Sequence, residues 1–239
     1  MINKQLLFII TMLIQISLVT KADTISKTIV FDDNTNSAPQ INWDQEIKEN
    51  YSLDLKLPFG QINVQPSSDN KIHISALPNP RSYNDEFHKF VSGTNDPQLL
   101  KEFGLKIDQS ENSFSIDTII PELPEERKNK IEKEKGRPLI YPNEILAFPV
   151  FINVSVPTRY LKSLKLNGEN PFVTVSNLNK NNSQKQLSIE IKTQNFVSVK
   201  DSRFLKLNIS SKNRIQLIRN EGLIQFPTSK NGIEIDSRF

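Results

Sequence analysis

Apolar and polar residues alternate in short runs along most of the chain. Alternation with a period of two places every second side chain on one face of an extended strand, whereas a helix has a period near 3.6. The pattern predicts strands over residues 27–33, 53–57, 61–65, 71–76, 103–108, 113–120 and 148–158. A helix is expected over 121–136, where charges of both signs are mixed, and a shorter one within 95–103. The chain is therefore expected to be all-β with short helical insertions.

The last third of the chain repeats one pattern four times. The segments LKLNGENPFVTV, IEIKTQNFVSV, LNISSKNRIQL and IQFPTSKNGIEI each hold an apolar-x-apolar pair, a polar connector with an asparagine, and a second apolar-x-apolar pair. The asparagines are Asn170, Asn195, Asn213 and Asn231. Such repeats indicate stacked units, none of which buries its apolar face alone. They predict a right-handed parallel β-helix (solenoid) with coils of about 18–25 residues, and an antiparallel β meander or sandwich stays open as the alternative.

The asparagines recur at every second strand, which favours a coil over a hairpin. Asparagine accepts the left-handed turn conformation, and its amide can bond to an equivalent amide on the next coil. We therefore expect the four asparagines to form a structural turn ladder.

In the stretch KTQNFVSVKD, residues 192–201, alternation assigns Val197 and Val199 to the core. Ser198 and Lys200 are then the candidate outward-facing surface residues. The single tryptophan, Trp43, is expected to close one end of the core, because buried aromatic side chains dominate core energetics.

Residues 1–22 have the features of a cleaved secretory signal, with a lysine near the start, an apolar run from Leu6 to Val19 and small residues before the cleavage site. The run of about 14 residues is shorter than the roughly 20 that a membrane-spanning helix needs. We expect export to the periplasm, the cell surface or the medium, with no membrane span after removal of the signal.

The mature chain is expected to have two parts. Residues 23–50 form a polar capping segment, and residues 51–239 form a single β-solenoid domain. Two insertions interrupt that domain, at about 77–102 and 121–147.

Composition excludes several kinds of site. The chain has no cysteine, which rules out disulfides, cysteine-ligated metals and cysteine nucleophiles. Of its two histidines, His73 is expected on the solvent side of a strand and His88 in an insertion. Loss of the signal lowers the formal net charge from +3 to +1, and acidic and basic residues are interspersed, so no nucleic-acid partner is expected.

The sequence indicates no catalytic residue, no metal site and no cofactor, since it contains no nucleophile elbow, phosphate-binding loop, zinc helix or EF-hand motif. A glycosidase would need two carboxyl groups about 5–9 Å apart. Glu190, Asp201 and Asp236 are carboxylates of the repeats, but they fall on different coils.

The succession FGQINVQPSSDNKIHISA, FPVFINVSVPTRYLKSLKLNGENPFVTVSNL and the asparagine repeats resembles the GIN-type adhesin head domains of bacterial exported proteins. The matching positions at the entry into the repeats are Val154, Val156, Pro157, Leu161 and Leu164. The resemblance covers residues 50–239 and implies a parallel β-helix, export and an adhesive role, with no established reaction.

We therefore predict an exported, non-enzymatic solenoid that binds a cell-envelope component, a glycan or another protein. One alternative is a carbohydrate-active β-helix enzyme, a polysaccharide lyase or hydrolase. The other is a structural envelope protein that self-associates through the strand edges of its C-terminal coil.

Overall fold

The computed structural model describes residues 24–30, 41–57, 60–78, 104–119, 124–138, 150–169, 171–180 and 186–236. Within these ranges the chain is all-β, as predicted, with one helix, α5 (Glu125–Lys135), inside the charged segment where a helix was expected. The strands are β1 (Ile25–Val30), β2 (Ile41–Glu46), β3 (Tyr51–Lys56), β4 (Gln61–Pro66), β5 (Lys71–Pro78), β6 (Gly104–Ser110), β7 (Ser113–Ile119), β8 (Val150–Val156), β9 (Leu161–Asn167), β10 (Phe172–Ser176), β11 (Ser188–Thr193), β12 (Val197–Lys200), β13 (Arg203–Ser211), β14 (Ile215–Ile218), β15 (Glu221–Thr228) and β16 (Ile233–Asp236).

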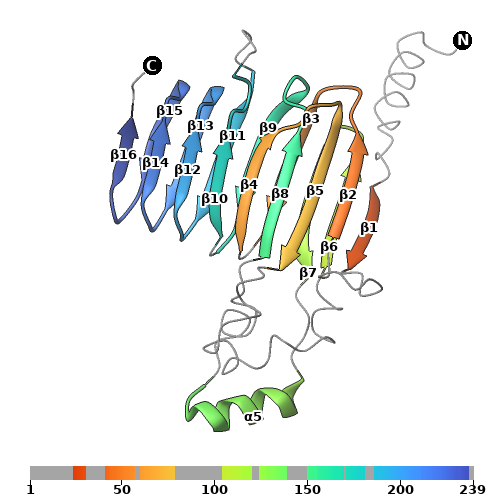
Figure 1. The fold of residues 1–239 in the computed structure, drawn as a ribbon, viewed down its shortest axis with the longest axis vertical. Helices are drawn as coiled ribbons and strands as arrows, with labels where there is room; N and C mark the ends of the chain where they lie inside the picture. Colours follow the sequence, from red (N-terminus) through yellow and green to blue (C-terminus); the bar gives the residue numbers. More distant parts are fainter. Residues whose placement is uncertain are drawn as a thin grey trace, which may run out of the picture.

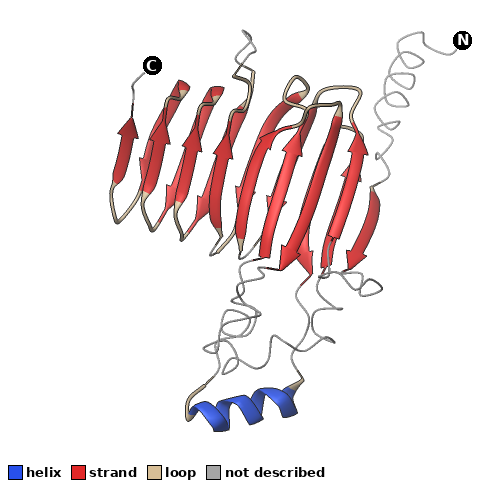
Figure 2. Cartoon of the chain, in the orientation of Figure 1, coloured by secondary structure: helices blue, strands red, loops and turns tan. Residues whose placement is uncertain are grey.

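The described strands form two eight-stranded sheets that face each other (Figure 1). The order in the first sheet is β1-β6-β7-β3-β9-β11-β13-β15, and in the second it is β16-β14-β12-β10-β4-β8-β5-β2. Figure 2 shows α5 beyond one end of the strands, away from both sheets. The helix is strongly polar and ends at Gly136, whose φ of 68° is left-handed. None of its described side chains is buried.

From β9 to β16, a region that we call the C-terminal stack, successive strands alternate between the two sheets. From β11 onward, each strand pairs in parallel with the strand two places earlier in the chain. The register sets equivalent residues of successive repeats side by side, so that Ile189 lies between Leu164 and Leu207. The described strands of this stack are therefore parallel, while the two facing mixed sheets as a whole also fit the sandwich that stayed open as the alternative.

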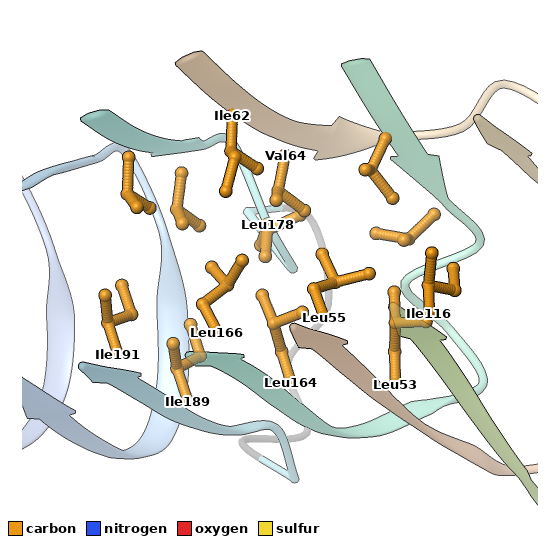
Figure 3. Packing of buried hydrophobic residues seen from close by; sticks show 14 of the residues in the cluster. Leu53, Leu55, Ile62, Val64, Ile116, Leu164, Leu166, Leu178, Ile189 and Ile191 are labelled. Atoms are coloured by element: carbon orange, nitrogen blue, oxygen red, sulfur yellow. The ribbon is translucent and has the colours of Figure 1, made fainter. Parts of the chain in front are cut away.

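The core fills the space between the two sheets. On β3, Leu53 and Leu55 are 1% and 0% exposed, and Asp54 between them is half-buried. Figure 3 shows these two side chains projecting toward the strand that carries Ile62 and Val64 in the second sheet. Because burial of apolar surface contributes about 25 cal/mol per Å², this continuous apolar layer is the main attraction between the sheets.

The order of strands in space departs from chain order in the N-terminal half. β3 pairs in parallel with both β7 and β9, and β4 pairs in parallel with both β8 and β10. Strands that come early in the chain thus lie in the middle of each sheet, between strands that come much later.

The far end of the sheets, opposite β15 and β16, is built from antiparallel pairs, β1 on β6 and β2 on β5. Trp43 of β2 is 7% exposed there and meets the ring of Phe114 edge-on, with 6.2 Å between ring centroids. Tyr51 meets the same ring at 6.0 Å. This aromatic cluster covers the end of the core, in agreement with the predicted place of Trp43.

Several predicted features lie wholly or largely outside the described residues: the signal at 1–22, the insertion at 77–102 with its helix within 95–103 and His88, and Asn170. In the part of the chain that the structure covers, no helix is both long and apolar enough to cross a bilayer.

Candidate functional site

The last three turns that lead from the first sheet to the second in the C-terminal stack share a hydroxyl residue. The three residues are Thr193, Ser211 and Ser229. Ser211 Oγ accepts the backbone N–H of Asn213 at 3.0 Å and donates to the backbone carbonyl of Asn195 in the previous coil at 2.5 Å. The other two hydroxyls make equivalent pairs of bonds. Each hydroxyl therefore stabilises its own turn and links that turn to the turn of the preceding repeat by a hydrogen bond.

The asparagines that follow these hydroxyls lie in one column. Asn213 Nδ2 donates to Asn195 Oδ1 at 3.5 Å, and Asn231 Nδ2 donates to Asn213 Oδ1 at 3.4 Å. Asn213 Oδ1 also accepts the backbone N–H of Arg214 at 2.8 Å. The amide–amide distances are at the long end for hydrogen bonds, so the bond to the backbone is the stronger one. Such a column is what a structural turn ladder requires.

The left-handed conformation expected at these asparagines is wrong. Positive φ occurs instead at the opposite turns, at Asn177 (58°), Asp201 (48°) and Arg219 (47°). Only two residues separate β12 from β13 there, and a connection that short needs a left-handed residue to turn the chain. At the turns of Asn195 and Asn213, the hydroxyl and Oδ1 acceptors satisfy the backbone N–H groups without one, whereas Gly232 in the turn of Asn231 has a φ of 100°.

A groove of about 500 Å³ runs along the asparagine turns, and we call it the corner groove. It is lined by Gly168, Glu169, Lys192, Thr193, Gln194, Ser210, Ser211, Lys212, Ser229 and Lys230. Its volume is within the range of ligand sites, and it is open to solvent along its length. The wall needs a glycine at position 168, because a Cβ there would lie 2.1 Å from the carbonyl oxygen of Leu57.

The corner groove is electropositive, with three lysines against Glu169. Lys212 Nζ donates to Gln194 Oε1 at 2.9 Å, and Lys192 Nζ pairs with Glu190 Oε1 at 2.5 Å. The hydrogen bond from Lys192 lowers the pKa of Glu190, and lysines on both neighbouring strands lower it further, against the opposing effect of burial. Lysine charge therefore dominates this edge of the first sheet, which favours anionic ligands.

The two outward-facing candidates have different surroundings. Ser198 is 2% exposed, because its short side chain donates to Gln216 Oε1 on the neighbouring strand at 3.1 Å and lies below longer side chains. The prediction that Ser198 is accessible is therefore wrong. Lys200 is half-buried at the end of β12, in register with Ile218. Neither residue lines the corner groove.

His73 is held by two carboxylates on the outer side of the second sheet. Its Nδ1 lies 2.7 Å from Asp44 Oδ1 on the edge strand β2, and its Nε2 lies 2.9 Å from Asp69 Oδ1 in the turn before β5. An imidazole donates from both nitrogens only when it is protonated. The hydrogen bond to Asp44 makes the largest contribution to raising the pKa of His73, and the hydrogen bond to Asp69 makes the next largest. The pKa of Asp69 is lowered most by the hydrogen bond from the Ser67 hydroxyl, and then by those from the Lys71 N–H and from His73. His73 on β5 thus joins β2 and the turn before β5 through its two ring nitrogens, and we call this arrangement the clasp.

The clasp predicts a pH dependence of stability. Because the folded-state pKa of His73 is raised above its unfolded value, its contribution is full below about pH 6.5 and is lost as the pH rises through the folded-state pKa. The groups are partly exposed, so we expect the melting temperature of the wild type to fall by no more than about 3 °C. Melting curves of the wild type and His73→Gln between about pH 6 and pH 9 measure this. The control is His88→Gln, which should show the same pH dependence of the melting temperature as the wild type. If the melting temperatures of the wild type and His73→Gln change with pH in parallel, the prediction is contradicted.

The carboxylates considered for glycoside hydrolysis do not come together. Glu190 lies on the first sheet and is paired with Lys192, whereas Asp236 lies on β16 in the second sheet. Asp201 receives two hydrogen bonds of 2.7 Å from Arg219 at the stacked position of the next coil, and the pKa of Asp201 is lowered mainly for that reason. Among the described residues, no three His, Cys, Asp or Glu side chains are grouped to hold a metal ion.

Sequence reasoning missed both the corner groove and the clasp. Part of the groove signal was present, since lysine directly precedes Asn213 and Asn231 in two repeats. The clasp had no such signal, because the contact of Asp44 with His73 depends on the antiparallel register of β2 on β5.

No protein-family model matches the chain, so the resemblance to GIN-type adhesin head domains stays a prediction, and no curated protein matches it either. Among solved structures, it is similar to a candidate cell adhesion protein from Clostridium sporogenes, at 9% identity over 82% of this chain and 99% of that chain, with a TM-score of 0.47. It is also similar to a candidate adhesin from Bacteroides fragilis, at 12% identity over 84% of this chain and 94% of that chain, with a TM-score of 0.35. A candidate adhesin from Parabacteroides merdae follows at 10% identity, with 84% and 97% covered and a TM-score of 0.25. At these identities and TM-scores, the similarity assigns no property of those proteins to this chain.

Proposed function

We propose that this protein is an exported, non-enzymatic, adhesin-like binding protein built as a β-solenoid, and that it holds an acidic polysaccharide in the corner groove. The observation that carries the proposal is the recurrence of lysine and hydroxyl groups on successive coils along the groove. The signal-like segment at 1–22 and the resemblance to adhesin head domains support export and adhesion.

The spacing of the groove residues favours a polymer over a small molecule. Lys212 and Lys230 directly precede stacked asparagines whose residue numbers differ by 18, and they come from neighbouring coils. Adjacent strands are about 4.8 Å apart, so equivalent groups lie along a straight line at regular intervals. A linear chain with evenly spaced carboxylates can follow the groove over several repeats and meet their lysines and hydroxyls together, whereas a small anion reaches only neighbouring groups.

The polar surroundings of the lysines suit sugars as well as carboxylates. Gln194 and Ser210 add an amide and a hydroxyl beside the ammonium groups. These groups donate to and accept from sugar hydroxyls. Because the lysines are exposed, their attraction for the polymer falls steeply as salt screens the charges.

Binding of polygalacturonate, an acidic polysaccharide, to the purified mature protein tests the proposal, with neutral dextran as the comparison. We expect binding of polygalacturonate alone, weakened about tenfold or more in the double variant Lys212→Gln, Lys230→Gln, which corresponds to about 1.4 kcal/mol. The matched control is Lys130→Gln, Lys133→Gln on the exposed helix α5, which removes the same charge from residues that do not line the groove.

Two outcomes would overturn the proposal. One is equal affinity of the groove variant and the helix variant for polygalacturonate, since the charge would then act only through the whole molecule. The other is equal binding of dextran and polygalacturonate. Polyphosphate, used as a second polyanion, distinguishes recognition of an acidic sugar from attraction of any polyanion.

A further inference from the structure

The C-terminal end of both sheets presents strand edges that lack a partner. β15 is the last strand of the first sheet and β16 the last strand of the second (Figure 1, left), and no described strand pairs with their outer edges. Such an edge offers a row of backbone N–H and C=O groups to an incoming strand.

Apolar side chains are also uncovered at this edge. Ile233 and Ile235 of β16 are 43% and 62% exposed. Their register partners on β14, Ile215 and Leu217, are 0% and 1% exposed because β16 covers them. An added strand would cover Ile233 and Ile235 in the same way, so the edge combines free backbone groups with an apolar contact.

The acidic residues of β16 favour an incoming strand that carries basic residues. Glu234 Oε2 accepts hydrogen bonds from Arg214, which directly precedes β14, and from Gln216 of β14, while Glu234 Oε1 accepts none within the described part of the chain. β14 therefore shows which sequence β16 accepts on its inner edge: an arginine, then apolar residues that alternate with a polar one. The outer edge presents the N–H and C=O groups of the residues between those that bond to β14, beside the same carboxylate.

A second copy of this chain fits the edge poorly. Two β16 strands side by side would bring Glu234 and Asp236 next to the acidic residues of the other copy. A β2 strand from the far end of another copy would bring Asp44 and Glu46. Like charges opposite each other destabilise a strand pair.

We propose that the outer edge of β16 binds an extended segment of a partner protein in which apolar residues alternate with arginine or lysine, as a further strand of the second sheet. Its apolar residues cover Ile233 and Ile235, and its cations meet Glu234. This surface is separate from the corner groove.

A capped synthetic peptide with the sequence NRIQLIR, which is that of residues 213–219, serves as the probe. We expect it to bind the full mature protein, as measured by fluorescence anisotropy. Its affinity for Glu234→Lys is expected to be lower by a factor of about ten or more. The charge-reversed peptide NEIQLIE is expected to bind Glu234→Lys better than the wild type. Ile25→Lys, which changes an apolar residue that is 67% exposed at the far end, is the control and should bind NRIQLIR normally.

Failure of NRIQLIR to bind the wild type, or equal binding of both peptides to both proteins, would overturn the proposal. A dimer in sedimentation that Ile235→Lys dissociates and NRIQLIR does not displace would assign the edge to a second copy and also overturn it. The groove variant Lys212→Gln, Lys230→Gln should bind NRIQLIR as the wild type does, so the two proposals fail separately.

Discussion

Replacing Phe204 with alanine is expected to lower the free energy of unfolding by about 3–5 kcal/mol. Phe204 is 0% exposed and is the largest side chain among the fully buried residues of the described chain. Its ring lies directly over Gly222 of β15, where an added Cβ would come within 2.5 Å of a ring carbon. Removal of the ring would leave a cavity beneath the last strand of the first sheet, and the apolar contact that holds this strand would be lost.

Urea unfolding of the wild type and Phe204→Ala measures this change as a shift of the midpoint. The matched control is Phe172→Ala, the same substitution at a residue that is 50% exposed, for which a much smaller effect is expected. If Phe204→Ala does not fold, Phe204→Leu serves in its place. Equal destabilisation by the two alanine variants would contradict the burial of Phe204.

Replacing Asn213 with alanine is expected to cost about 2–3 kcal/mol, because three hydrogen bonds of a partly buried side chain are lost at once. Its Oδ1 accepts from the Arg214 N–H and from Asn231, and its Nδ2 donates to Asn195. Since Asn213 is the middle member of the column, the loss reaches the coils on both sides. This change tests the role of the asparagines as a turn ladder.

The measurement is again the urea midpoint, with Asn208→Ala as the control. Asn208 lies on the outer side of β13, in the same coil, and makes no side-chain hydrogen bond within the described residues. We expect Asn208→Ala to change the free energy of unfolding by less than about 0.5 kcal/mol. Comparable effects of the two substitutions would show that the column contributes no more than any surface asparagine.

Local pattern was sufficient for the strands of the repeats and for the residues that they bury. Val197 and Val199 are fully buried as predicted, because a strand has a strict period of two and one side must leave water. Ser198 follows the same alternation and was still assigned wrongly. Alternation tells which side of a sheet a residue occupies, whereas its exposure depends on the lengths of the side chains on neighbouring strands.

For the asparagine turns, the sequence indicated the shared role of the residues but not their backbone conformation. Their repetition indicated that Asn195, Asn213 and Asn231 have one role in three places, and the structure sets them in one column. Their backbone conformation was predicted incorrectly, because the choice between left-handed and ordinary φ depends on the number of residues in each connection and on which acceptor reaches its N–H groups.

The sequence by itself determined that the chain is all-β, that its last third repeats, and that its inward-facing residues are apolar, since these follow from local alternation and residue type. Only the tertiary structure decided that β3 and β4 lie between later strands, that Asp44 and Asp69 hold His73, and that lysines of separate repeats line one groove. Strand partners and register arise from long-range packing of a shared core, and hydrophobic alternation is the same for every partner that a strand could have.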